Sequence, residues 1–99
     1  MNLLKSLHFN ESKPATAVIY KSEKINYLAV GLLKEQMLKK HQTSIPTLLT
    51  VIKGKLEFTI GNNMIVLNEF DTYHIPVLTE HEVKGTEDQN LFTLIQEKA

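Results

Sequence analysis

Residues 47–67 have the sequence Thr47-Leu-Leu-Thr-Val-Ile-Lys-Gly-Lys-Leu-Glu-Phe-Thr-Ile-Gly-Asn-Asn-Met-Ile-Val-Leu67. Residues 48–52 are almost wholly apolar. Residues 55–60 alternate between polar and apolar side chains, which is the period-2 pattern of a half-buried strand. Gly54 and residues 61–63 interrupt the pattern with residue types that tolerate a positive φ. The segment therefore predicts three short strands joined by turns.

The rest of the chain continues this pattern. Further strands are expected at residues 15–20, 72–75, 81–84 and 91–96, where β-branched, aromatic and alternating apolar residues gather between turn-type breaks. Residues 25–33 are ambiguous, because the apolar side chains could form a helical face that residues 34–40 would extend, whereas Gly31 and the lack of an N-cap argue against a helix. Seven to nine short strands in one domain indicate an all-β sandwich or barrel.

Composition limits the class of protein. The 99 residues make one domain, and we expect a loosely ordered lead-in over residues 1–12 before a β-barrel domain over residues 13–99. Eleven basic and eleven acidic residues cancel, which gives no electrostatic footprint for nucleic acid. The absence of cysteine excludes disulfides and thiolate zinc sites. The longest apolar run, residues 28–33, is far below the roughly 18 residues of a membrane span, so we expect a cytoplasmic protein without a membrane or nucleic-acid partner.

Two histidines, His41 and His81, stand in degraded copies of a known pair of motifs. The chain resembles a small single-domain cupin of the RmlC-like jelly-roll type, whose first motif is Gly-x5-His-x-His-x3/4-Glu-x6-Gly. His41 fits its first histidine and Gly54 its closing glycine, whereas Thr43 replaces the second histidine and Thr47 the glutamate.

The second cupin motif is Gly-x5-Pro-x-Gly-x2-His-x3-Asn. Pro76 and His81 fit it, whereas Phe70 and Leu78 replace its two glycines and Gly85 replaces its asparagine. The resemblance covers residues 28–96. It implies a cupin-like double-stranded β-helix (jelly-roll barrel), favours a strand over residues 25–33, and implies a homodimer, because members of the family are commonly dimers.

The resemblance also implies a site. In cupins the four motif positions that correspond to 41, 43, 47 and 81 bind one divalent metal, and three imidazoles with a carboxylate suit zinc, iron, nickel or manganese. This chain offers two imidazoles and two threonine hydroxyls there. Zinc sites in proteins use three or four ligands, and a neutral hydroxyl is a poor one. We therefore expect no tightly bound metal; a weakly bound ion would be held by His41 and His81.

A small-molecule pocket is the leading hypothesis. If the cupin alignment holds, the two histidines and two threonines of the motif converge inside the barrel. Three further side chains then lie at strand positions that face inward. The expected pocket residues are His41, Thr43, Thr47, His81, Leu49, Val51 and Tyr27. Apolar walls with a few convergent polar groups are typical of a small-ligand site, and imidazoles and hydroxyls can bind a sugar hydroxyl, a carboxylate or a phosphate oxygen. The chain would then bind a small polar molecule as a sensor, carrier or accessory protein.

Two other functions remain open from the sequence. The chain could be a cupin enzyme, either a mononuclear-metal dioxygenase or isomerase or a metal-free isomerase in which His41 and His81 exchange protons with the substrate. It could instead be a structural or interaction module whose internal polar groups bond one another and trapped water. No catalytic residue can be assigned from the sequence.

Overall fold

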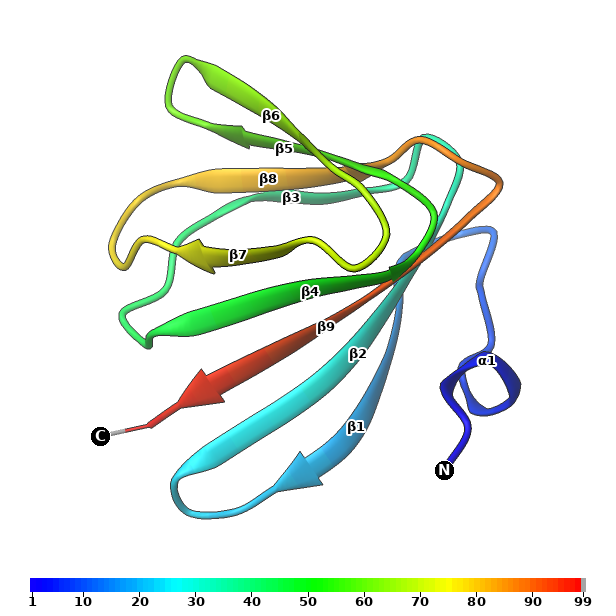
Figure 1. Ribbon diagram of the computed structural model, residues 1–99, viewed down its shortest axis with the longest axis horizontal. Coiled ribbons are helices and arrows are strands. Elements are labelled where there is room, and N and C mark those ends of the chain that lie inside the picture. The colour runs from blue at the N-terminus through cyan, green and yellow to red at the C-terminus, as the bar shows by residue number, and fades with distance from the viewer. Residues whose placement is uncertain (99) are drawn as a thin grey trace.

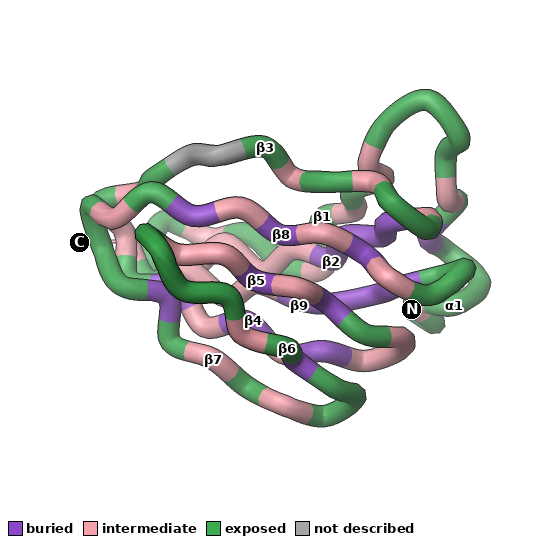
Figure 2. The backbone as a smooth tube through the Cα atoms, turned by 90° about the horizontal axis from the view of Figure 1, so that it is seen from above, coloured by how far each residue is buried: buried purple, intermediate pink, exposed green. Residues whose placement is uncertain are grey.

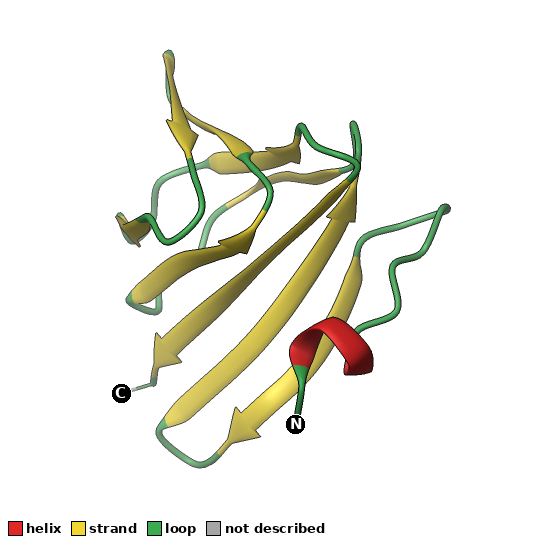
Figure 3. Cartoon of the chain, turned by 45° about the vertical axis from the view of Figure 1, so that its right-hand side comes forward, coloured by secondary structure: helices red, strands yellow, loops and turns green. Residues whose placement is uncertain are grey.

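The computed structural model describes residues 1–98 and, at Lys40 and His41, the backbone alone. In this part of the chain one short helix precedes nine strands (Figures 1 and 3). The elements are α1 (Leu3–Ser6), β1 (Ala15–Lys21), β2 (Ile25–Leu33), β3 (Met37–His41), β4 (Thr47–Lys53), β5 (Leu56–Ile60), β6 (Asn63–Leu67), β7 (Thr72–Ile75), β8 (His81–Gly85) and β9 (Gln89–Glu97). The expected all-β fold is confirmed.

The strands form two antiparallel sheets. The five-stranded sheet has the order β1-β2-β9-β4-β7, and the four-stranded sheet has the order β3-β8-β5-β6. Along each strand the side chains alternate between the interior and the outer surface, and the buried positions lie along the strands between the sheets (Figure 2). The interior residues are Val30, Leu32, Leu49, Val51, Leu56, Phe58, Leu67, Ile75, Val83 and Phe92. This arrangement is the jelly-roll barrel expected from the sequence.

Strand β2 explains why residues 25–33 are ambiguous in the sequence. The strand pairs with β1 on one side and with β9 on the other. Val30 and Leu32 face the barrel interior, whereas Ala29 belongs to a second apolar cluster on the outer side of the sheet. A strand that is covered on both faces has a nearly continuous apolar sequence without clear alternation.

The second cluster brings the N-terminal residues onto the outer side of the five-stranded sheet. Leu7 is buried there, with Leu3 and Phe9 packed against the cluster. Gly31 makes the contact possible, because a Cβ at this position would lie 2.9 Å from a ring carbon of Phe9. Leu3, Leu7 and Phe9 thus pack on the sheet. The loosely ordered lead-in that the sequence predicts over residues 1–12 stays a prediction.

The helical extension considered for residues 34–40 does not occur. The chain turns at Glu35, which has a φ of 73°, and the N–H of Gln36 donates to the carbonyl oxygen of Leu33 at 3.0 Å. Strand β3 then pairs with β8, and Leu38 packs against the interior cluster. Pairing with a strand that is distant in sequence thus overrides a local preference for helix.

Asn90 closes one end of the barrel, where the β2–β3, β4–β5, β6–β7 and β8–β9 connections meet (Figure 1). Its side chain is fully buried. The oxygen accepts from the N–H groups of Lys55 and Glu87 at 3.0 and 3.1 Å, and the nitrogen donates to the carbonyl oxygens of Leu32 and Glu87 at 3.0 and 2.8 Å. One amide therefore satisfies four backbone groups from three separate segments.

No helix among residues 1–98 has the length and apolar character needed to cross a membrane.

Candidate functional site

His81 is the buried titratable side chain at the opposite end of the barrel, where the β3–β4, β5–β6 and β7–β8 connections lie (Figure 1). It is the first residue of β8 and lies two residues before the interior residue Val83, so both side chains share the inward face of the strand. Only 3% of the residue is exposed. The imidazole stacks on the ring of Phe58 with a centroid distance of 5.3 Å and an interplanar angle of 12°. The aromatic contact fixes the plane of the imidazole.

The carbonyl oxygen of Thr79 sets the proton position on this ring. It lies 3.1 Å from Nδ1 of His81. Because a carbonyl oxygen only accepts hydrogen bonds, the proton of the neutral imidazole resides on Nδ1, and Nε2 is then an acceptor.

Thr47 lies at the same end of the interior. It begins β4 and is 6% exposed, and its backbone pairs with Ile75 on one side and Gln96 on the other. Its hydroxyl donates to the carbonyl oxygen of Ile45 at 2.9 Å and accepts from Nε2 of Gln96 at 3.3 Å. The second bond is longer than the usual range of about 2.7–3.2 Å and is therefore the weaker of the two.

Gln96 is missing from the set of residues expected from the sequence. In β9 it follows Phe92 and Leu94 at a spacing of two, and both of these residues belong to the interior cluster or pack against it. The period-2 pattern therefore contains the signal that places Gln96 on the interior face.

Thr43 does not occupy the place expected for it. Strand β3 ends at His41, so positions 41 and 43 do not share one strand face as the cupin motif implies. The Thr43 hydroxyl accepts from the N–H of Ile45 at 3.1 Å, and its carbonyl oxygen accepts from the N–H of Leu78 at 2.7 Å. Thr43 thus stabilises the β3–β4 loop and ties it to the β7–β8 loop.

Three apolar or aromatic residues complete the expected set. Leu49 and Val51 face the interior, but they are fully buried in the core beside Phe92. Tyr27 lies on the same face of β2 as Ala29, which belongs to the outer cluster. The expected inward orientation of Tyr27 is wrong. Residues 28, 30 and 32 are the positions of this strand that face the interior, so residue 27 faces outward.

His41 can be placed only by its backbone. It pairs with His81 across the β3–β8 ladder, beyond a register shift that follows Leu38. Its side chain lies outside the described part of the chain, so the convergence of the two imidazoles stays a prediction.

A hollow of about 450 Å³ opens on the outside of this end of the barrel. Its polar lining residues are Gln42, Thr59, Asn62, Thr79, Glu80 and Glu82, with Leu78 as an apolar wall. Thr79 lines the hollow and contacts the buried imidazole through its carbonyl oxygen, whereas His81 and Thr47 do not themselves line the hollow. Glu82 is adjacent to His81 in β8 and therefore belongs to the outer face of the strand.

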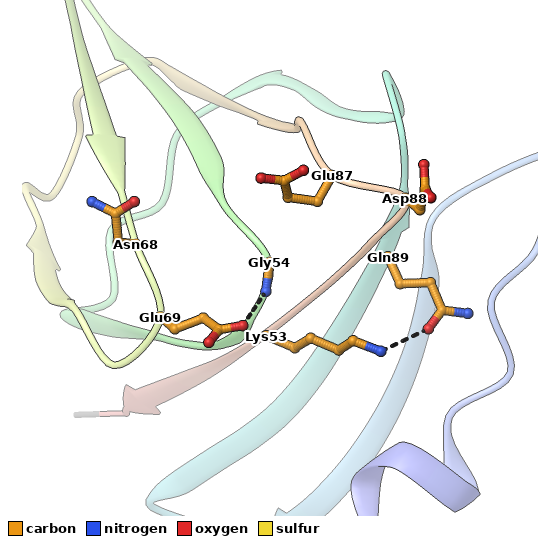
Figure 4. Close-up of a pocket in the computed structure, with 7 residues that line it drawn as sticks. All are labelled: Lys53, Gly54, Asn68, Glu69, Glu87, Asp88 and Gln89. Carbon is orange, nitrogen blue, oxygen red and sulfur yellow. Dashed lines mark hydrogen bonds between the residues drawn. The ribbon is translucent and has the colours of Figure 1, made fainter.

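A larger hollow of about 940 Å³ lies at the end that Asn90 closes (Figure 4). It lies among turns, and two of its lining pairs are hydrogen-bonded: Lys53 Nζ to Gln89 Oε1, and the N–H of Gly54 to Glu69 Oε2, each at 3.0 Å. No buried titratable group among the described residues adjoins it. We therefore place the candidate site at the His81 end.

Comparisons with known proteins identify the family. The family model described as the cupin domain matches residues 28–95. The chain belongs to the cupin family. No curated protein matches the chain.

Solved structures share the fold of this chain. A cupin superfamily protein from Desulfitobacterium hafniense superposes with a TM-score of 0.88 at 14% identity, covering 100% of this chain and 90% of that one. TT1209 from Thermus thermophilus gives 0.89 at 19% identity, covering 98% and 94%. KdgF from Halomonas gives 0.82 at 16% identity, covering 100% and 94%. At these identities the likeness establishes the fold.

The described residues do not fit the metal centre of a cupin. The positions of the second histidine and the glutamate are Thr43 and Thr47, and the hydroxyls of both already bond within the β3–β4 loop or to Gln96. Within the described side chains no group of three histidines or carboxylates could hold an ion. Two imidazoles with bonded hydroxyls are a poor donor set for a divalent metal.

Two positions where the cupin motif has glycine have other residues here but keep the positive φ that glycine adopts easily. Phe70 has a φ of 68° and Leu78 a φ of 56°. In Phe70 the conformation is imposed by neighbouring bonds: its N–H donates to the carbonyl oxygen of Val51 at 2.7 Å, and that of Asp71 donates to the carbonyl oxygen of Asn68 at 3.0 Å. Both turns therefore carry backbone strain.

We expect Phe70→Gly and Leu78→Gly each to raise the free energy of unfolding by about 0.5–1 kcal/mol, because the left-handed conformation costs a side-chain-bearing residue about 1–2 kcal/mol and glycine loses more entropy on folding. The side chains are 76% and 66% exposed, so little packing is lost. Thermal unfolding measures the change. Val77→Gly, at a 44% exposed neighbour without a positive φ, is the control and should destabilise. If both glycine variants were less stable than the wild type, Phe70 and Leu78 could not be under backbone strain.

Proposed function

We propose that this cupin binds a small, hydroxyl-rich molecule at the His81 end of its barrel without a tightly bound metal, as a sensor, carrier or accessory protein. The observation that carries the proposal is the junction at Thr79. This residue lines the 450 Å³ hollow and also binds the buried imidazole through its carbonyl oxygen. The volume lies within the range of about 300–1,000 Å³ that is usual for ligand pockets.

The groups at this end favour a neutral ligand with several hydroxyls. The lining supplies amides from Gln42 and Asn62 and hydroxyls from Thr59 and Thr79, which both donate and accept hydrogen bonds. Glu80 and Glu82 add acceptors, and their negative charge disfavours a phosphate or a carboxylate. The chemistry therefore narrows the three ligand types considered from the sequence to the sugar-like one.

The interior supports the same proposal. Phe58 contacts both His81 and Tyr73, with the Tyr73 ring centroid 5.0 Å away. This aromatic wall fixes the imidazole beside the end of the barrel, where the Thr47 hydroxyl makes its long bond to Gln96. A pre-positioned imidazole and an exchangeable hydroxyl can orient a ligand without a large cost in side-chain entropy.

The proposal predicts that a neutral sugar stabilises the protein more than an anion does. Tag-free protein would first be tested for metals, and one equivalent of tightly held zinc, iron, nickel or manganese would contradict the metal-free reading. Thermal unfolding would then be followed with glucose and with citrate as probes. We expect a saturable rise in Tm with glucose and none with citrate, because the carboxylates of the hollow repel an anion.

Matched variants locate the binding. Thr47→Val removes the hydroxyl with little change of shape, and His81→Gln retains a hydrogen-bonding side chain. We expect each to weaken glucose binding about tenfold, which corresponds to about 1.4 kcal/mol. His74→Gln is the control, because His74 is exposed on β7. Equal binding by all three variants would show that the sugar does not depend on the Thr47 hydroxyl or the His81 imidazole, and would contradict the proposal.

A further inference from the structure

Leu78 combines a strained backbone with an exposed apolar side chain that lines the 450 Å³ hollow. In the part of the chain that the structure describes, three residues other than glycine have a positive φ: Glu35, Phe70 and Leu78. The Glu35 side chain forms an ion pair with Lys84, and Phe70 lines neither of the two hollows. Leu78 has a φ of 56°, is 66% exposed and lines the smaller hollow. Strain of this kind persists only where the surroundings hold the residue in place.

Three hydrogen bonds hold the β7–β8 loop in this conformation. The N–H of Leu78 donates to the carbonyl oxygen of Thr43 at 2.7 Å, which ties the loop to the β3–β4 loop at the same end of the barrel (Figure 1). The Thr79 hydroxyl donates to the carbonyl oxygen of Val77 at 3.2 Å, and the Thr79 carbonyl oxygen lies 3.1 Å from Nδ1 of His81. The loop is thus fixed on both sides of Leu78, so a ligand that contacts this side chain would lose little affinity to ordering of the loop.

The rest of the lining is polar. Apart from Gly61, the other lining residues carry an amide, a hydroxyl or a carboxylate, and Leu78 is the one apolar side chain among the described residues of the lining. A ligand that matches this lining has hydroxyls over most of its surface and an apolar group at one place. The hollow has a volume typical of pockets for drug-sized ligands, so it has room for a substituent beside one sugar ring.

We propose that Leu78 forms an apolar subsite of this hollow and that the ligand is a glycoside with an apolar aglycone. The inference rests on the proposed sugar site and names the class of sugar that the site binds. The polar lining bonds the sugar hydroxyls, and Leu78 covers the aglycone, which removes apolar surface of both from water. Leu78 therefore costs stability through its backbone and contributes to binding through its side chain, a trade-off that is common at functional sites.

Calorimetric titrations with glucose and with phenyl β-glucoside compare the two parts of the site, because these probes share the sugar ring and differ in the phenyl group. We expect the metal-free wild-type chain to bind phenyl β-glucoside about tenfold more tightly than glucose. Contact of the phenyl group with Leu78 needs to remove only on the order of 50 Å² of apolar surface from water to produce this ratio.

Variants at position 78 and its neighbour assign the ratio to one side chain. Leu78→Asn removes the apolar side chain at a similar size, and asparagine tolerates a positive φ better than leucine does. We expect the affinity ratio of the two probes to fall to about one, whereas thermal unfolding should show a stability at least equal to that of the wild type. Leu78→Met retains an apolar side chain and should retain the ratio. Val77→Asn is the matched control, because Val77 is 44% exposed but does not line the hollow.

The outcomes distinguish this inference from the proposed function. Equal affinity of the wild type for both probes would overturn the subsite, and the sugar site would remain. An unchanged ratio in Leu78→Asn would also overturn it, because Leu78 would then contact the sugar ring or no part of the ligand. Loss of the ratio in Val77→Asn would overturn it as well. Binding of phenyl β-glucoside alone, lost in Leu78→Asn, would support the subsite and contradict the expected binding of glucose, whereas binding of neither probe would overturn both proposals.

Discussion

Replacing Asn90 with alanine is expected to lower the free energy of unfolding by about 3–5 kcal/mol. The change removes the partner of four backbone groups: the N–H groups of Lys55 and Glu87 and the carbonyl oxygens of Leu32 and Glu87. Each buried polar group that loses its partner costs about 1–3 kcal/mol, and water that enters the space recovers part of this. Because small domains have about 5–15 kcal/mol of stability, the variant should unfold at a much lower denaturant concentration.

Gln89→Ala is the control for this variant. Gln89 is the adjacent residue, it is exposed, and its side-chain bond is to the ammonium group of Lys53. We expect a change within about 0.5 kcal/mol, as for other surface substitutions. If the two variants unfolded at the same urea concentration, the Asn90 amide could not be what holds the three segments together.

The central strands can be predicted from the sequence because their signals are local. Gly54 marks a turn, and the alternation over residues 55–60 gives β5 its interior face. The same local signals predict β7 and its end before Pro76. In these segments the periodicity of the side chains and the turn chemistry agree with the fold.

The strand and the residues that the sequence does not predict depend on contacts between distant parts of the chain. Strand β3 forms from helix-favouring residues because β8 lies beside it. Asn90 looks like one more turn residue after Asp88, but its partners include Lys55 and Leu32, which are 35 and 58 residues away. Spacing within the sequence contains no information about such partners.

The candidate site is predictable only in part for the same reason. The motif places His81 and Thr47 at one end of the interior, and the structure places both there. The motif also assumes that β3 continues through Thr43, whereas the strand ends at His41. The inward orientation expected for Tyr27 depended on an alignment of strand parity, and an error of one residue moves a side chain to the other face.

Gly54→Ala is the second substitution with a large expected effect, and we expect it to cost about 2–5 kcal/mol of stability. Gly54 has a φ of 84°, a conformation that costs a residue with a side chain about 1–2 kcal/mol. A Cβ there would also lie 2.6 Å from the carbonyl oxygen of Gln89 and would press on the Asn90 amide. Relief of that overlap requires a shift of the β8–β9 turn, and overpacking typically costs a further 1–3 kcal/mol.

Gly61→Ala separates the two causes. Gly61 has a φ of 58°, so its alanine variant suffers the same kind of backbone strain, but a Cβ at this position meets nothing within 4 Å. We expect it to cost about 1–2 kcal/mol, and urea unfolding of the two variants gives the difference directly. A difference of at least about 1 kcal/mol measures the overlap with the Gln89 carbonyl and the Asn90 amide. If the two variants were equally stable, backbone conformation alone would explain the glycine at position 54, and the close packing of the turn around Asn90 would contribute nothing to it.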